Sequence, residues 1–127
     1  MVSSVQNACA AYLDAWQRKD LQGIVACLHP EVQFKSPNAS TRGRDMYIPG
    51  AQRFLSLVDR VEVRAKFLSQ DGAMFVLDFH CVQPIGICPT AELVGFKDGL
   101  IYQDEIFFDA RPFEALMRAK VAGSVEK

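Results

Sequence analysis

Histidine and cysteine are scarce in this sequence, and their spacing does not suit a metal site. The chain has two His and four Cys, and no group of them has the paired spacing of zinc ligands. We therefore expect no metal. Cys9, Cys27 and Cys81 are expected as reduced, apolar core side chains. Cys88 falls in a wide connection and is expected to be exposed, without the nearby positive charge that a reactive thiol needs.

An excess of basic residues and long apolar runs are also lacking. Fourteen Lys and Arg balance fifteen Asp and Glu, for a net charge of -1, so no basic field favours nucleic acid or an anionic membrane. The apolar stretches are too short to span a bilayer. The first residues lack the basic and apolar segments of a signal peptide, which predicts a cytoplasmic protein.

Hydrophobic residues, by contrast, are plentiful. They make up half of the 127 residues and include nine Phe, whose large side chains fill cores and line pockets. The length is typical of one domain, and no linker, repeat or low-complexity segment divides it. We expect a single soluble domain over residues 1–127.

The first half of the sequence predicts helices. Apolar residues recur every three or four positions over residues 5–16, 21–28 and 48–58. Asp20 and Asp45 are expected to cap the second and third of these helices.

A short strand and a loop are expected between the second and third helices. His29 and Pro30 should end the second helix, because proline disfavours helical geometry in the residue before it. Residues 31–36 alternate in polarity as a strand does, and residues 37–43 are expected to form a loop.

The second half predicts strands joined by hairpins. Alternating segments cover residues 61–67, 75–81, 90–96 and 100–108. A closing helix should turn four side chains inward: Phe113, Leu116, Met117 and Val121. Helices gathered first and strands later indicate an α+β fold with a curved antiparallel sheet, in which the helices leave an apolar pocket.

Four segments, taken in order, resemble the nuclear transport factor 2-like superfamily and most closely its SnoaL-like polyketide cyclase and ketosteroid isomerase branch. They are residues 12–21, 32–37, 42–45 and 92–109. The resemblance implies a cone-shaped half-barrel that dimerises through the outer face of its sheet. It also implies chemistry or binding of a small molecule without a bound cofactor.

The resemblance assigns roles to three positions. Tyr12 matches a tyrosine that donates an oxyanion-hole hydrogen bond; the alternative is a core tyrosine with a satisfied hydroxyl. Glu92 matches a second donor, an acid kept neutral by apolar surroundings; the alternative is a structural pair with Arg42 or Arg44. The general base of the isomerases falls at Ser36, which cannot take a proton from carbon unaided. This difference argues against steroid isomerase activity.

Asp104 is a candidate acid/base. Along the last strand it shares a face with Tyr102, Ile106 and Phe108. A carboxyl group on an apolar wall has a raised pKa and exchanges protons near neutrality. SnoaL-like cyclases carry their acid/base aspartate on this strand, so the resemblance agrees. A slip of one residue would instead place Glu105 inside.

The strand at residues 75–81 has a wholly apolar face, which we expect to point inward. Asp78 and His80 then lie on the outer face, where a dimer interface is expected, and His80 serves as a base only in the reversed register. His29 is expected at the rim. The side chains expected to line the ligand pocket are Trp16, Phe34, Phe54, Leu77, Phe79, Ile106 and Phe108.

Two functions are consistent with these features. In the first, Asp104 acts as general acid/base, assisted by Tyr12 and Glu92, on a small hydrophobic molecule that is cyclic or carries a carbonyl group. The reaction would be an isomerisation, aldol-type cyclisation, dehydration or hydrolysis. In the second, the domain binds a ligand, or serves as a dimeric scaffold, without catalysis.

Overall fold

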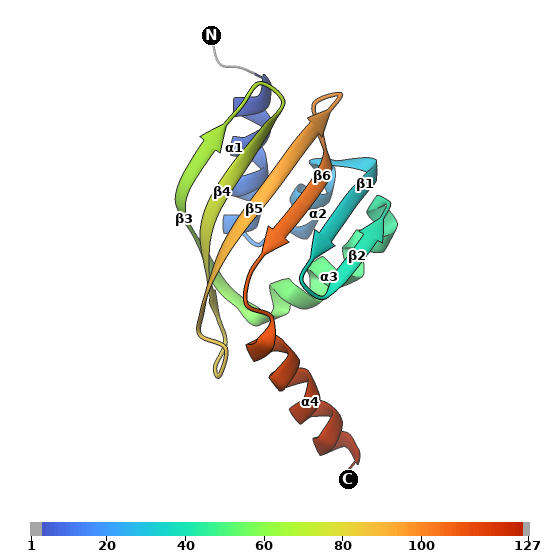
Figure 1. The fold of residues 1–127 in the computed structure, drawn as a ribbon, viewed down its shortest axis with the longest axis vertical. Helices are drawn as coiled ribbons and strands as arrows, with labels where there is room; N and C mark the ends of the chain where they lie inside the picture. The colour runs from blue at the N-terminus through green and yellow to red at the C-terminus, as the bar shows by residue number, and fades with distance from the viewer. Residues whose placement is uncertain (1–3, 126–127) are drawn as a thin grey trace.

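A computed structural model describes residues 4–125 of the chain, and the side chains of residues 4–120. It has an α+β fold, as predicted (Figure 1). The elements are α1 (Ser4–Gln17), α2 (Leu21–Ala26), β1 (Leu28–Ser36), β2 (Ala39–Arg42), α3 (Arg44–Leu57), β3 (Val58–Leu68), β4 (Gly72–Cys81), β5 (Ile87–Lys97), β6 (Leu100–Phe107) and α4 (Arg111–Val125).

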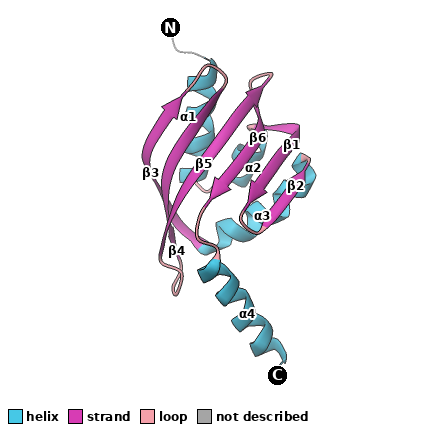
Figure 2. Ribbon diagram, viewed as in Figure 1, coloured by secondary structure: helices cyan, strands magenta, loops and turns pink. Residues whose placement is uncertain are grey.

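One six-stranded sheet organises the fold. Its strand order is β2-β1-β6-β5-β4-β3, and it curves without closing, with α1, α2 and α3 on one face (Figure 2). Neighbouring strands are antiparallel except β1 and β6, which run parallel. The sheet is therefore mixed rather than wholly antiparallel. A parallel pair needs a long crossover, which the chain from β2 to β5 supplies.

The segment between α2 and α3 contains more strand than the sequence predicts. β1 begins at Leu28 and runs through Pro30, whose missing N–H is tolerated because the register with β6 shifts between Leu28 and Gln33. The expected loop contains β2, an edge strand. The N-cap of α3 is Gly43, with a φ of 93°, whereas Asp45 lies in the first turn. Asp20 caps α2 as predicted.

An irregularity in β3 changes which side chains face outward. The register with β4 shifts between Val63 and Ala65. The side chains of Val61 and Phe67 therefore point to opposite faces of the sheet. Val61 is 6% exposed, whereas Phe67 is 63% exposed. The simple alternation that grouped them on one face is therefore wrong beyond residue 63.

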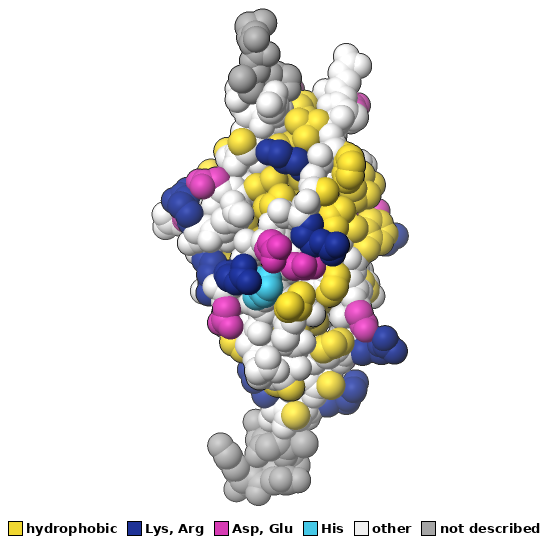
Figure 3. Space-filling model, turned by 90° about the vertical axis from the view of Figure 1, so that its left-hand side faces the viewer, with side chains coloured by type: hydrophobic (Ala, Val, Ile, Leu, Met, Phe, Trp, Pro, Cys, Tyr) yellow, Lys and Arg dark blue, Asp and Glu magenta, His cyan; other side chains and the backbone are white. Residues whose placement is uncertain are grey.

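β4 follows the predicted alternation throughout. Its apolar face, Phe75, Leu77, Phe79 and Cys81, is buried. Asp78 and His80 lie on the other face. Asp78 forms an ion pair with Arg64 (3.6 Å), and Nε2 of His80 lies within hydrogen-bond distance of Glu62 (3.0 Å). Figure 3 shows charged side chains gathered beside an apolar patch on this side of the molecule.

The last helix packs less closely than the sequence predicts. Phe113, in its first turn, is buried and Leu116 is half-buried, but Met117 is 54% exposed, and the side chain of Val121 lies outside the described residues. The helix leads away from the sheet (Figure 1). No helix within residues 4–125 combines the length and apolarity needed to cross a membrane.

Candidate functional site

Three of the predicted site residues meet in the interior. The Tyr12 hydroxyl, from α1, donates a hydrogen bond of 2.6 Å to Oε2 of Glu92 on β5. The same hydroxyl lies 3.5 Å from Oδ2 of Asp104 on β6. The fold thus brings together one phenol and two carboxyl groups from three separate elements.

The strand register explains why the two carboxyl groups are neighbours. Val94 pairs with Asp104 and Glu92 pairs with Ile106, so the acids lie diagonally opposite on adjacent strands and on the same face. The expected inward direction of Asp104 is confirmed. Tyr102, expected on that face, instead accepts a hydrogen bond of 3.1 Å from Gln33.

A bulge accounts for the different placement of Tyr102. The pairing of β5 with β6 shifts between Gly95 and Phe96, and this inserts an extra residue into β6. Ile101 and Asp104 therefore both point inward, at 0% and 1% exposure, although they are three positions apart.

Burial dominates the electrostatics of the acid pair. Glu92 is 3% exposed and Asp104 is 1% exposed. Removal from water raises the pKa of Asp104 well above its usual value, and the nearby Glu92 charge raises it further. Burial also raises the pKa of Glu92, although hydrogen bonds from Asp104 and Tyr12 oppose this shift. Asp104 is therefore the group shifted more strongly toward its protonated form, and the two carboxyl groups titrate as a unit.

Tyr47 is a fourth member that the sequence analysis missed. It lies on α3, is 5% exposed, and interacts with Tyr12, Glu92 and Asp104. Burial raises the pKa of Tyr47 and of Tyr12 well above the usual value, so both hydroxyls remain proton donors. Tyr47 lies four positions before Ala51, which places both residues on one face of α3. The apolar face predicted from the sequence would include Tyr47 if it were extended by one turn toward the N-terminus.

Arginine does not neutralise the acid pair. The shifts in the pKa of Glu92 come from burial, Asp104 and Tyr12 alone. Arg44 donates to the carbonyl oxygen of Leu28 at 3.2 Å, and Arg42 lines a groove on the outer face of the sheet. The expected alternative, a structural ion pair of Glu92 with either arginine, is wrong.

Ser36, at the position of the isomerase base, takes no part in this cluster. Its hydroxyl donates at 3.0 Å to Oδ1 of Asn38, in the exposed turn between β1 and β2. Cys88 is also placed differently from expectation. It lies on the inward face of β5, opposite Phe79, and is 6% exposed, so burial raises the pKa of its thiol.

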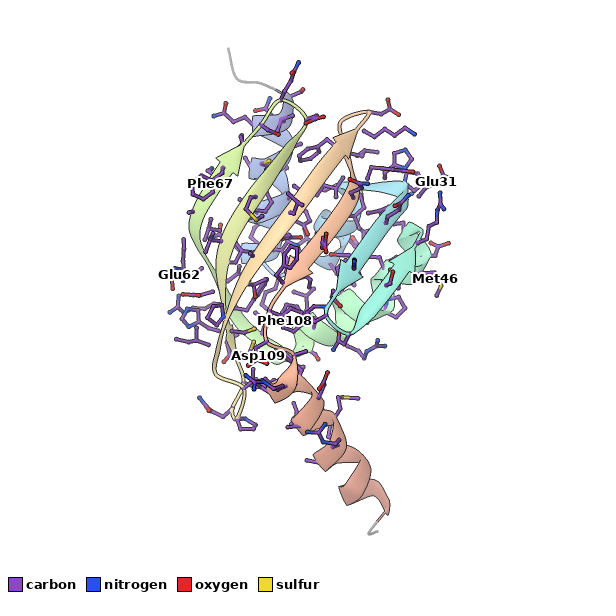
Figure 4. The ribbon with its side chains drawn as sticks, in the orientation of Figure 1. Glu31, Met46, Glu62, Phe67, Phe108 and Asp109 are labelled. Atoms are coloured by element: carbon purple, nitrogen blue, oxygen red, sulfur yellow. The ribbon has the colours of Figure 1, made fainter. Side chains whose placement is uncertain are left out.

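The predicted pocket side chains are all buried or partly buried, and the ring of Phe54 contacts Phe113 in the first turn of α4. Trp16, Leu77 and Phe79 are buried, and Phe34, Phe54, Ile106 and Phe108 are partly buried. Trp16 contacts Phe54 and Phe79 edge to face, with ring centroids 6.0 and 5.7 Å away. Figure 4 places Phe108 beside the start of α4.

A separate groove lies on the opposite face of the sheet. Its volume is about 940 Å³. Outward side chains of all six strands line it: Lys35, Arg42, Phe67, Met74, Leu93, Gln103 and Glu105. Asp104 of the acid pair also contributes to the lining of this groove, between the outward residues Gln103 and Glu105.

The acid pair gives the interior a defined chemical capacity. A protonated carboxyl group donates a proton, and an adjacent carboxylate accepts one. Tyr12 and Tyr47 add hydroxyl donors in surroundings of low polarity, where electrostatic interactions are strong.

Comparison with known proteins agrees with this architecture. Residues 9–103 match the SnoaL-like domain, so the chain belongs to the SnoaL-like family. A crystal structure of a protein from Kribbella flavida DSM 17836 is similar over 94% of this chain and 98% of its own, with 24% identity and a TM-score of 0.83.

Two further structures carry names of enzymes. A proposed ketosteroid isomerase from Kribbella flavida DSM 17836 is 16% identical, with a TM-score of 0.74, over 84% of this chain and 78% of its own. An epoxide hydrolase of M. tuberculosis, described as LEH-like, is 19% identical, with a TM-score of 0.69, over 98% and 97% of the two chains. These likenesses show the fold. The comparison with curated proteins gave no match.

Proposed function

We propose that the protein is a cofactor-independent acid/base catalyst that acts on a small, hydrophobic, oxygen-bearing molecule. Asp104 is the proposed acid, Glu92 the proposed base, and Tyr12 the proposed hydroxyl donor. The observation that carries this proposal is the buried pair of carboxyl groups joined through Tyr12.

The proposed cycle conserves the single proton of the pair. Asp104 gives its proton to a substrate oxygen, and Glu92 removes a proton from a substrate carbon or from an attacking water. The pair then again holds one proton, now on Glu92. Transfer of that proton back to Asp104 restores the starting state without a cofactor. Isomerisation, aldol-type cyclisation, dehydration and hydrolysis all fit this cycle.

Access to the pair requires side chains to move, because both carboxyl groups are buried. The aromatic side chains suggest a path. From Trp16 the rings of Phe54 and then Phe113 follow at centroid distances of 6.0 and 5.8 Å, and Phe108 adjoins Phe113 at 5.4 Å. Phe54 and Phe108 are partly exposed. We therefore place the proposed pocket entrance at the base of α4.

Exchange of carbon-bound protons tests this proposal. Acetophenone in deuterated water should lose its methyl protons faster with the protein than without it, and styrene oxide tests the hydrolytic alternative. Asp104→Asn should reduce either activity by about 10²- to 10⁴-fold, the usual contribution of a general acid or base. The matched control is Glu105→Gln, one residue along β6, whose side chain faces outward toward Lys35.

A ligand-binding or scaffold domain without catalysis is the second candidate. The position of Ser36 at the end of β1, where it bonds to the turn residue Asn38, favours it, because the expected base is missing from the cluster. This candidate predicts equal proton exchange by the wild type and Asp104→Asn. An acceleration that Asp104→Asn abolishes and Glu105→Gln retains would eliminate it.

We also propose a homodimer that forms through the outer face of the sheet. Phe67 pairs with Met74, and Met74 with Leu93, so an outer apolar row crosses three strands. Phe67 is 63% exposed and Leu93 is 44% exposed, and Phe107 adds a further 48% exposed ring on β6. Exposed apolar patches of this kind are typical of protein interfaces.

A cytoplasmic location is part of the proposal. All four cysteines are unpaired, which is usual in a reducing compartment. Fractionation of the native host tests this location directly.

A further inference from the structure

Trp16 is the only tryptophan of the chain, and its indole N–H is unsatisfied. The side chain belongs to a residue that is 6% exposed, and its Nε1 finds no hydrogen-bond partner among the described residues. The rings around it, Tyr12, Phe54 and Phe79, stand edge to face. These contacts satisfy the apolar surface of the indole but leave its donor unused.

An unused donor in the core is costly. Leaving a buried polar group without a partner costs about 1–3 kcal/mol. A phenylalanine would fill much of the same space without that cost. Buried unsatisfied groups are few in native proteins, and each calls for an explanation.

A second unsatisfied atom belongs to the acid pair. Oδ1 of Asp104 is buried and has no partner within the described residues, whereas Oδ2 lies near Tyr12. Tyr12 contacts both residues that carry an unsatisfied atom. Its hydroxyl reaches the acid pair, and its ring lies 6.4 Å from that of Trp16, one turn further along the same face of α1.

The charge around these atoms restricts what can bind. Tyr12, Glu92 and Asp104 influence one another, Tyr47 also acts on Tyr12, and no basic side chain within the described residues contributes. A buried anionic ligand would meet the negative charge of the pair without compensation. A neutral molecule avoids this repulsion, and its oxygen atoms can accept hydrogen bonds.

We propose that Trp16 is a specificity-determining residue, whose indole N–H donates to an oxygen of a neutral aromatic or alicyclic substrate while a second oxygen of that substrate meets Asp104. This inference rests on the proposed function and specifies its substrate class: compounds with two oxygen groups, one for positioning and one for reaction. The rings around Trp16 provide the apolar walls between them.

Three related compounds test the inference. Acetophenone carries one oxygen, para-hydroxyacetophenone carries two and is neutral when its phenol is protonated, and para-acetylbenzoate is an anion. Para-hydroxyacetophenone should bind about three- to tenfold more tightly than acetophenone, the gain that one neutral hydrogen bond provides. Para-acetylbenzoate should bind most weakly. In Trp16→Phe, which keeps an aromatic ring, the preference for the hydroxylated compound should disappear.

A measurement on the unaltered protein complements the variant. Because the chain has one tryptophan, its nitrogen-15 spectrum contains one indole N–H signal. Para-hydroxyacetophenone should move this signal downfield more than acetophenone does. Equal affinities, an unmoved signal or the absence of binding by all three compounds would overturn the inference. Asp104-dependent proton exchange with no discrimination at Trp16 would overturn it while leaving the proposed function intact.

Discussion

The Tyr12 hydroxyl lies 2.6 Å from Oε2 of Glu92, although 80 positions separate the two residues in the sequence. The short distance is typical of a hydrogen bond to a charged oxygen. It agrees with our proposal that Glu92 is the base of the acid pair, because burial raises the pKa of the Tyr12 phenol and keeps it a hydrogen-bond donor. In that proposal Asp104 is the member that holds the proton.

Loss of the Tyr12 hydroxyl should weaken the fold. Tyr12→Phe removes a donor from a buried carboxylate, so the free energy of unfolding should fall by about 1–3 kcal/mol. The loss should be larger at alkaline than at acidic pH, since a protonated Glu92 needs the donor less. Urea denaturation at several pH values measures the effect. Tyr102→Phe is the control, and an equal loss there would contradict the assignment.

The acid pair should make stability depend on pH in an unusual direction. Folding raises the pKa of both carboxyl groups, so above about pH 4 the folded chain holds a proton that the unfolded chain has released. The free energy of unfolding should therefore fall as the pH rises through the raised pKa, by at most about 1.4 kcal/mol per pH unit for one proton.

Asp104→Asn should remove most of this dependence. The amide cannot ionise, so the variant should become more stable than the wild type at alkaline pH. Thermal or urea denaturation of both proteins across the pH range checks this prediction. Parallel curves for the two proteins would show that Asp104 ionises normally. Glu105→Gln should leave the wild-type curve unchanged, because Glu105 lies on the outer face.

The hydroxyl groups of Tyr47 and Tyr12 should contribute to stability as coupled members of one hydrogen-bonded cluster. Tyr47→Phe should lower the free energy of unfolding by about 0.5–1.5 kcal/mol, the usual net value of one hydrogen bond. Since the two hydroxyls belong to one cluster, the effects of Tyr12→Phe and Tyr47→Phe should not add. A double-mutant cycle measures this coupling, and strict additivity would place Tyr47 outside the cluster.

The outer apolar row should control association. Leu93→Glu introduces a charge at the centre of the proposed interface and should shift the protein from dimer to monomer at micromolar concentration, as measured by sedimentation equilibrium. Met117→Glu alters an exposed apolar residue on α4, 54% exposed against 44% for Leu93, and should leave the dimer intact. A monomeric wild type, or a dimeric Leu93→Glu, would refute the proposed interface.

The periodic spacing of apolar residues predicted much of the fold, because in most elements the apolar face is the face that packs in the core. β4 keeps its alternation from Phe75 to Cys81, and the helices α1 and α3 bury the expected faces. The periodic spacing gave wrong facings where a bulge adds an unpaired residue to a strand. The irregularities near Arg64 and Phe96 change the facing of Phe67 and Tyr102. Gly95 adjoins the second, as a strand glycine often does at a bulge, whereas no glycine or proline adjoins the first.

The site was predicted unevenly for a related reason. Asp104 and Tyr12 follow from alternation and helical spacing, so their inward direction could be predicted. The neighbours of Glu92 could not be predicted in the same way. Asp104 is near Glu92 because of the register between β5 and β6, and Tyr12 is near it because α1 packs on this part of the sheet. Tyr47 lies one position before Ile48, the first residue of the predicted apolar face, although helical spacing from Ala51 extends to it.

Carbon-13 NMR titration of the assigned carboxyl carbons of Asp104 and Glu92 tests the central claim most directly. If the pair holds one proton in the interior, Asp104 should show the shift of a protonated acid at neutral pH. That signal should change only at higher pH, together with the signal of Glu92. Independent titration of both groups near pH 4, where unperturbed carboxyl groups ionise, would contradict the account.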